Sequence, residues 1–260
     1  MGTTIAIVDA SVGETPAARN LTREIDAETT VHKASAGQFP PAASGMRDID
    51  GVVISGSQTA VYEDKDWIHH LGMWVRDSAA ADVPMLGICW GHQILAQSLG
   101  GRVVDTGEYE LGYRTIERVG NDPIFDGLPR SVTAFQTHSD RVAELPPGAV
   151  ELARNDYGNQ AFRLGSTYGV QFHPEYDLET AEWVVGNKDL SAAKRDTVTA
   201  GLNEENAASA RDVKAVFDNF LDIVATHSRR PGSTPLDNER FQHSHSAQRS
   251  GMVVVRGEDS

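Results

Sequence analysis

The first half of the chain alternates short apolar runs with longer segments in which apolar residues recur at helical spacing. Runs without apolar/polar alternation are typical of strands buried on both faces of a parallel sheet, and they lie at 5–10, 50–55 and 83–88. A further strand is predicted at 29–34, and helices are predicted at 17–25 and 67–81. This order predicts an α/β fold with a mostly parallel open sheet and helices on both faces.

The pattern changes after residue 100, where short strand-like segments are separated by turn-forming residues. These segments lie at 102–104, 113–119, 132–135, 150–153 and 160–163. Such a succession predicts antiparallel strands added at the edge of the sheet. Helical spacing returns over 178–228, with a polar middle and a last helix whose apolar face includes Phe217 and Phe220. Residues 229–260 carry little to bury, and we expect a flexible tail there.

Composition limits the classes of protein that this chain can be. At 260 residues and 40% hydrophobic it can bury a large core. No stretch approaches a transmembrane run, and the N-terminus enters a strand without a signal peptide, so we expect a cytoplasmic protein with no membrane partner. The single cysteine excludes an internal disulfide and fits a reducing compartment.

The charge balance is acidic, with 37 Asp and Glu against 23 Lys and Arg and a net charge of −14. Such a balance argues against nucleic acid and against anionic membranes as partners. The chain contains five lysines, at positions 33, 65, 188, 194 and 214. Acid-rich, lysine-poor surfaces resemble those of salt-adapted proteins, so a halophilic source is our expectation.

The most informative stretch joins the apolar strand at 83–88 to a short helix that carries Ile94 and Leu95. Between them, Cys89 is flanked by Gly87 and Gly91 in a Gly-x-Cys-x-Gly pattern, the cysteine version of a nucleophile elbow. The glycines are expected to allow a sharp turn, which places the thiol at a helix N-terminus that favours the thiolate. The alternative is that Cys89 is a small buried hydrophobe.

A candidate base lies far downstream, where an apolar run from 168 to 172 ends at His173. Pro174 follows, and Glu175 comes two residues after the histidine, so its carboxylate can accept a hydrogen bond from one imidazole nitrogen while the other faces a thiol. Alone, this pattern would indicate a strand-end histidine capped by an acid. His92 is a weaker candidate base, since the His173–Glu175 pair also supplies the orienting carboxylate.

Two motifs together, 87–93 (Gly-Ile-Cys-Trp-Gly-His-Gln) and 171–175 (Gln-Phe-His-Pro-Glu), resemble the signature pair of class I, triad-type glutamine amidotransferases. The likeness is greatest to the glutaminase domain of GMP synthetase and its free-standing relatives. It covers residues 4–185 in the right order and spacing. The resemblance implies a flavodoxin-like fold, an amidotransferase domain over 1–228 with its core at 4–185, and Cys89, His173 and Glu175 as catalytic triad.

Attack of a thiolate on a carboxamide creates an oxyanion, which needs preorganised N–H donors. The elbow supplies one, the N–H of Trp90, which follows the nucleophile. By resemblance, Gly56 belongs to the oxyanion loop and supplies the other. The family usually has Gly-Gly-Pro where this chain has Gly56-Ser57-Gln58, and Gly56 ends a strand in either case.

The resemblance also implies substrate-binding residues. Gln93, one helical turn after Cys89, matches a glutamine that contacts the substrate. Thr137 and His138 match a Ser-His-x-Asp loop that holds the amino-acid end of the substrate, with threonine in place of serine. The alternative for this segment is a structural loop capped by Asp140. No cofactor or metal is implied, and we interpret the histidines at 243 and 245 as solvent-exposed.

The predicted activity is hydrolysis of the glutamine side-chain amide through a cysteine thioester, which yields glutamate and ammonia. No phosphate-binding loop of Walker type appears, so we expect any ATP-dependent synthetase, such as GMP synthetase, to be a separate chain. Two alternatives stay open. One is a partner-independent γ-glutamyl hydrolase or peptidase, and the other is a non-catalytic regulatory subunit.

Overall fold

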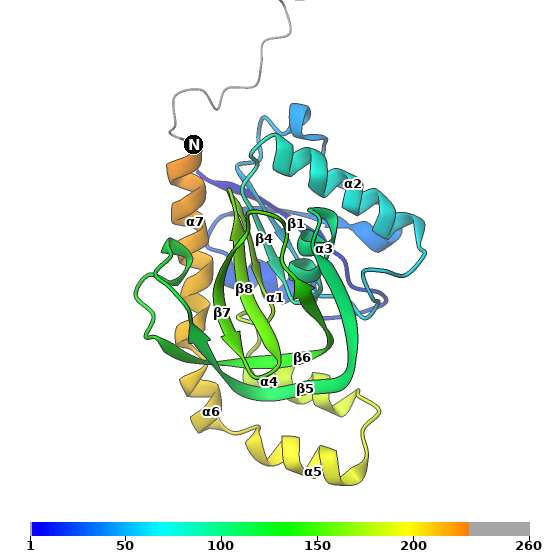
Figure 1. Cartoon of the computed structure of the whole chain (residues 1–260), viewed down its shortest axis with the longest axis vertical. Helices are drawn as coiled ribbons and strands as arrows, with labels where there is room; N and C mark the ends of the chain where they lie inside the picture. Colours follow the sequence, from blue (N-terminus) through cyan, green and yellow to red (C-terminus); the bar gives the residue numbers. More distant parts are fainter. Residues whose placement is uncertain (1, 229–260) are drawn as a thin grey trace, which may run out of the picture.

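The computed structural model describes residues 2–228, which form an open nine-stranded sheet between helices (Figure 1). The strand order is β2-β1-β3-β4-β9-β8-β7-β5-β6. The strands are β1 Thr4–Asp9, β2 Glu28–Lys33, β3 Gly51–Ile54, β4 Met85–Ile88, β5 Arg102–Arg118, β6 Ser131–Glu144, β7 Val150–Asn155, β8 Gly158–Leu164 and β9 Thr167–Val170. The helices are α1 Ala17–Glu24, α2 Asp66–Ala80, α3 Trp90–Ser98, α4 Leu178–Gly186, α5 Ala192–Gly201, α6 Glu204–Ser209 and α7 Ala215–Ser228.

Helices cover both faces of the parallel half of the sheet, because successive side chains of each strand point to opposite faces. Ile5, Ile7 and Val53 pack in one core with α1 and α7. Val8 and Ile54 point the other way, into a second core with α2 and α3. The predicted open α/β sheet is therefore confirmed. Within residues 2–228, no helix combines the length and the apolar character needed to span a membrane.

The pairing divides the sheet into two halves. Strands β2, β1, β3, β4 and β9 pair in parallel, and the four remaining strands are joined to β9 and to each other by antiparallel pairing. The prediction of antiparallel strands at the edge is confirmed, but their lengths were wrong. The segments predicted at 102–104 and 113–119 belong to one strand, β5, and 132–135 is the beginning of the long strand β6.

The reason for this difference is the pairing between β5 and β6. Residues between Asp105 and Glu110 are mostly polar, and the register shifts between those two positions. Asp105 pairs with Asp140 and Glu110 pairs with His138, so residues 106–109 form a bulge without register partners in β6. Pairing on both sides of this bulge joins the two predicted segments into one strand.

The predicted helical region is divided into α4, α5, α6 and α7. Its polar middle forms two helices, and the side chains of Ser191 and Asn203 cap them by accepting backbone N–H bonds. Ala181 and Val184 of α4 pack with Phe135 and Leu111 of the antiparallel strands in a third, smaller core. The predicted tail at 229–260, including the histidines at 243 and 245, lies outside the described residues.

Candidate active site

The nucleophile candidate occupies the junction between β4 and α3. Cys89 is the N-cap of α3 and has φ 54° and ψ −104°, a conformation that non-glycine residues rarely adopt. Strain of this kind concentrates at functional sites because the surrounding structure must impose it. The flanking glycines have a different role from the one predicted, since neither has a positive φ. They allow close packing of the backbone, while Cys89 itself makes the turn.

Gly91 shows how close this packing is. A Cβ atom there would clash with the carbonyl oxygen of Ile54 in β3, and a Cβ atom at Gly87 would clash with the carbonyl oxygen of Gly91. Both obstacles are backbone atoms, which cannot rotate away as a side chain can. The two glycines therefore bring the start of α3 against β3 and β4.

We expect Gly91→Ala to lower the free energy of unfolding by about 2–3 kcal/mol, because an overpacked site forces backbone shifts. Urea unfolding measures this loss. Gly186→Ala, at the last position of α4, is the matched control because nothing lies within 4 Å of the added methyl group. An unchanged stability of Gly91→Ala would contradict the close packing.

The candidate base comes to the same edge of the sheet because β4 and β9 are parallel neighbours. The register pairs Ile88 with Val170, and the N–H of Cys89 donates to the carbonyl of Val170 at 2.8 Å. Three residues on, the backbone N–H of His173 donates to the carbonyl oxygen of Phe135 at 2.9 Å. His173 and Glu175 are both buried, with 2.7 Å between Nδ1 of the histidine and Oε1 of the glutamate.

The charges around His173 determine its protonation. Burial lowers the pKa of its imidazole, but the adjacent Glu175 and Cys89, as anions, outweigh burial and raise the pKa to about 10. The imidazolium is therefore favoured at neutral pH beside Cys89. Since Nδ1 is bound to Glu175, Nε2 is the nitrogen available for proton exchange with sulfur.

His92, the weaker candidate base, lies in a different environment. It is fully buried, and burial is the main cause that lowers its pKa to about 3. Its ring packs on Phe162 with 5.0 Å between the centroids. A neutral imidazole inside the core is a packing residue, so His173 is the better candidate for proton transfer.

Cys89, His173 and Glu175 line a cavity of about 200 Å³ at the carboxyl ends of the parallel strands. Gly56, after β3, lies at the same cavity, where a Cβ would come within 3.2 Å of Cε1 of His173 and 3.8 Å of Cβ of Cys89. Trp90 begins α3 directly after the cysteine and is buried. The residues predicted for the triad and the oxyanion loop thus meet at one edge of the sheet.

Of the three predicted substrate-binding residues, one lines the cavity and two lie outside its lining. Thr137 lines the cavity, and its carbonyl oxygen lies 4.0 Å from Sγ of Cys89. Gln93 and His138 are not among the lining residues. Nε2 of Gln93 donates to the carbonyl of Asp140 and to Oε1 of Gln171, at 2.9 and 3.1 Å.

His138 is held by the buried Glu110, with 2.8 Å between Nε2 and Oε2. The expectation that residues 135–140 form a loop at a strand end is wrong, because they lie in the middle of β6. Side chains alternate between the two faces of this strand, so Thr137 and His138 cannot both face the cavity.

Comparison with known proteins is consistent with this geometry. A family model described as glutamine amidotransferase class-I matches residues 6–188, well over half of the chain. The chain belongs to the class-I glutamine amidotransferase family.

The curated relatives of this amidotransferase include glutamine-hydrolysing GMP synthases. That of Thermomicrobium roseum is 41% identical over 126 residues, which are 48% of this chain and 23% of the relative. That of Porphyromonas gingivalis strain W83 is 34% identical over 182 residues, 67% of this chain and 34% of the relative. The chain therefore spans about a quarter to a third of the length of these two relatives.

Solved structures show the same fold. A glutamine amidotransferase from Thermotoga maritima superposes with a TM-score of 0.71 and 22% identity, covering 84% of this chain and 98% of its own. One from Methylobacillus flagellatus has a TM-score of 0.70 and 24% identity, covering 85% and 95%. At these identities the likeness supports the fold alone.

Several contacts of the candidate site have no signal in the sequence. The ring of Tyr176 stacks on His173, with 4.1 Å between centroids and 21° between planes. Arg23 of α1 donates to the carbonyl of Glu175 at 2.8 Å and pairs with Asp177 at 2.8 Å. These contacts hold the turn that carries the His–Glu pair. The contacts of Arg23 could not be predicted, because Arg23 lies far from that turn in the sequence.

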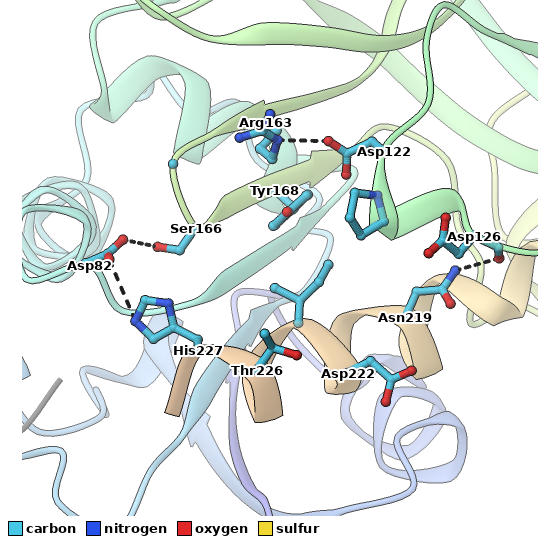
Figure 2. Close-up of a pocket in the computed structure, with 13 residues that line it drawn as sticks. Asp82, Asp122, Asp126, Arg163, Ser166, Tyr168, Asn219, Asp222, Thr226 and His227 are labelled. Carbon is cyan, nitrogen blue, oxygen red and sulfur yellow. Dashed lines mark hydrogen bonds and ion pairs between the residues drawn. The ribbon is translucent and has the colours of Figure 1, made fainter. Parts of the chain in front are cut away.

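A larger cavity of about 750 Å³ lies at the other end of the strands (Figure 2). Its lining residues include Asp82, just before β4, and Ser166, just before β9, whereas Cys89 and His173 follow those strands. Asp82 lies 3.8 Å from His227 and accepts a hydrogen bond from Ser166 at 2.8 Å. Because the single cysteine of the chain is at the opposite end, we place the candidate active site at the smaller cavity.

Proposed function

We propose that this chain hydrolyses the side-chain amide of glutamine through a Cys89 thioester, giving glutamate and ammonia. The observation that carries the proposal is the position of the His173–Glu175 pair beside Cys89 in one cavity at the carboxyl edge of the sheet. Membership of the class-I glutamine amidotransferase family supports the choice of glutamine.

In the proposed reaction, Sγ of Cys89 attacks the side-chain carbonyl carbon of glutamine while His173 holds the proton on Nε2. The N–H groups of Trp90 and Gly56 bind the oxyanion of the tetrahedral intermediate. Ammonia leaves with the proton from His173, and a water molecule activated by the neutral imidazole then attacks the thioester. Glutamate leaves, and the free sulfur of Cys89 is restored beside His173, which has regained its proton from the water. Glu175 orients His173 and stabilises the imidazolium throughout.

Three further residues are proposed to support substrate binding. Thr137 lines the cavity, so its strand is placed to contact the bound amino acid. Gln93 and His138 act indirectly, because their side chains hold the backbone of Asp140 and the buried Glu110 behind the cavity. Residues 1–228 are proposed as the amidotransferase domain.

We place the site that consumes the ammonia outside these 260 residues, in an ATP-dependent synthetase chain. The curated relatives support this proposal, since they are GMP synthases of which this chain spans about a quarter to a third. A cytoplasmic location fits the single cysteine and such a partner. Control by the partner is expected at the loop after β3 that begins with Gly56, because a misplaced oxyanion donor slows the reaction on the order of a hundredfold.

We expect weak release of ammonia from glutamine by the purified chain, and a higher rate with a nucleotide-bound synthetase subunit. Ammonia and glutamate are measured on glutamine and on γ-glutamyl peptides. Hydrolysis of peptides without hydrolysis of glutamine would replace the proposal with a γ-glutamyl hydrolase. Rapid unassisted turnover of glutamine would discard only the control by a partner. No turnover with any substrate or partner would favour a regulatory subunit.

A further inference from the structure

One wall of the Cys89 cavity carries a positive charge. This wall is formed by α4 and the residues that follow it. Lys188, two residues beyond the end of α4, lines the cavity together with Trp183 and Asn187. Among the described residues that line this cavity, Lys188 is the only lysine or arginine. The glutamate of the cavity, Glu175, is already bound to His173.

Lys188 differs from most lysines of this acidic chain. Lys33, Lys65 and Lys214 each pair with a carboxylate at 2.7–2.9 Å. In the described part of the chain, no carboxylate lies within ion-pair distance of Lys188. Since acidic residues exceed basic ones by 37 to 23, an ammonium without an acidic partner at a cavity is available to an anionic ligand.

An aromatic ring holds Lys188 in place without neutralising its charge. Its Nζ lies 4.9 Å from the centroid of the Tyr109 ring, within the range of a cation–π contact. The hydroxyl of Tyr109 hydrogen-bonds to that of Thr137 at 2.9 Å, and the carbonyl oxygen of Thr137 lies 4.0 Å from Sγ of Cys89. Tyr109, whose ring contacts the ammonium, is thus hydrogen-bonded to a residue that lies next to the nucleophile.

We propose that Lys188 binds the α-carboxylate of the substrate and determines specificity for free γ-amido amino acids. This inference rests on the proposed function. Glutamine presents its carboxamide to Cys89 and carries its charged groups at the opposite end of the molecule. In a cavity whose carboxylate is occupied by His173, the ammonium of Lys188 is the group that attracts the α-carboxylate.

The test compares L-glutamine with L-glutaminamide, whose neutral α-carboxamide replaces the carboxylate at similar size. We expect Lys188→Met to lower kcat/KM for glutamine about 10–100-fold, mostly through KM, as for loss of a charged hydrogen bond. The same variant should change kcat/KM for glutaminamide less than about twofold, because that substrate offers no charge to the ammonium. Lys188→Arg should recover most of the activity on glutamine.

Lys194→Met is the matched control. Nζ of Lys194 lies 5.8 Å from the centroid of the same Tyr109 ring and donates to the carbonyl of Tyr109, but Lys194 does not line the cavity. Its substitution should leave the preference for glutamine unchanged. Equal losses on both substrates in Lys188→Met, or the same loss of preference in Lys194→Met, would overturn the inference while the proposed function stands. A wild-type chain that hydrolyses neither substrate, with or without a synthetase, would overturn both.

Discussion

The Cys89→Ala variant is expected to release no ammonia from glutamine above background, with or without a synthetase. The thiol forms the covalent bond of the thioester, and the chain has no second cysteine to replace it. The fold should persist, because alanine accepts the backbone angles of Cys89 as well as cysteine does and removes only one buried sulfur atom. Steady-state ammonia release measures activity, and thermal unfolding shows that the variant is folded.

A glutamine analogue with an electrophilic side chain provides the control for this result. It should add one adduct to the wild-type chain, which mass spectrometry of peptides would locate at Cys89. Labelling that persists in Cys89→Ala would mean that another side chain is the nucleophile. The assignment of the elbow as the reactive centre would then be wrong.

His173→Ala is expected to slow thioester formation on the order of 10²–10⁴-fold, because it removes the group that acts as both base and acid. Glu175→Gln should cost less, since Glu175 orients the imidazole through its 2.7 Å contact but transfers no proton itself. The rate of thioester formation in a single turnover compares the two variants without contributions from the later steps. Equal or reversed losses would contradict these roles.

The protonation of His173 supplies a readout that activity does not. The pKa of about 10 means that the imidazole stays protonated through neutral pH, and nitrogen NMR of the ring should show this. In Glu175→Gln the anion is lost while the burial remains, so this pKa should fall.

The raised pKa of His173 also makes the stability of the fold depend on pH. A histidine whose pKa is raised on folding stabilises the fold fully below its unfolded value of about 6.5, and the contribution is lost as the pH rises through about 10. The difference in the free energy of unfolding between wild type and Glu175→Gln should therefore shrink as the pH rises from about 6.5 to about 10.

Much of the fold could be predicted because the parallel strands carry their signal locally. Residues 5–10 and 50–55 are continuous apolar runs, and a strand buried on both faces requires such a run. The triad candidates could be predicted for a related reason. Cys89 and His173 each follow an apolar strand, and the carboxyl ends of parallel strands meet at one edge of a sheet.

The long strands β5 and β6 could not be predicted, because the signal for them is not local. The residues between Asp105 and Glu110 form a bulge, and the strand continues past it because both flanks pair with β6, which begins more than twenty residues after Glu110. The same pairing turns His138 toward Glu110 and leaves Thr137 at the cavity. A one-residue difference along a strand reverses the face of the sheet, so resemblance alone could not assign the two side chains.

Local patterns in this chain thus determine the positions of the parallel strands along the chain, the elbow at Cys89 and the His173–Glu175 pair. Tertiary packing alone decided the positive φ of Cys89, the stacking of Tyr176 on His173 and the place of Lys188 at the cavity. The physical reason is the range of the interactions. Periodicity and turn chemistry act between neighbours in sequence, whereas Lys188 meets Tyr109 and the cavity only after α4 has packed against the antiparallel strands.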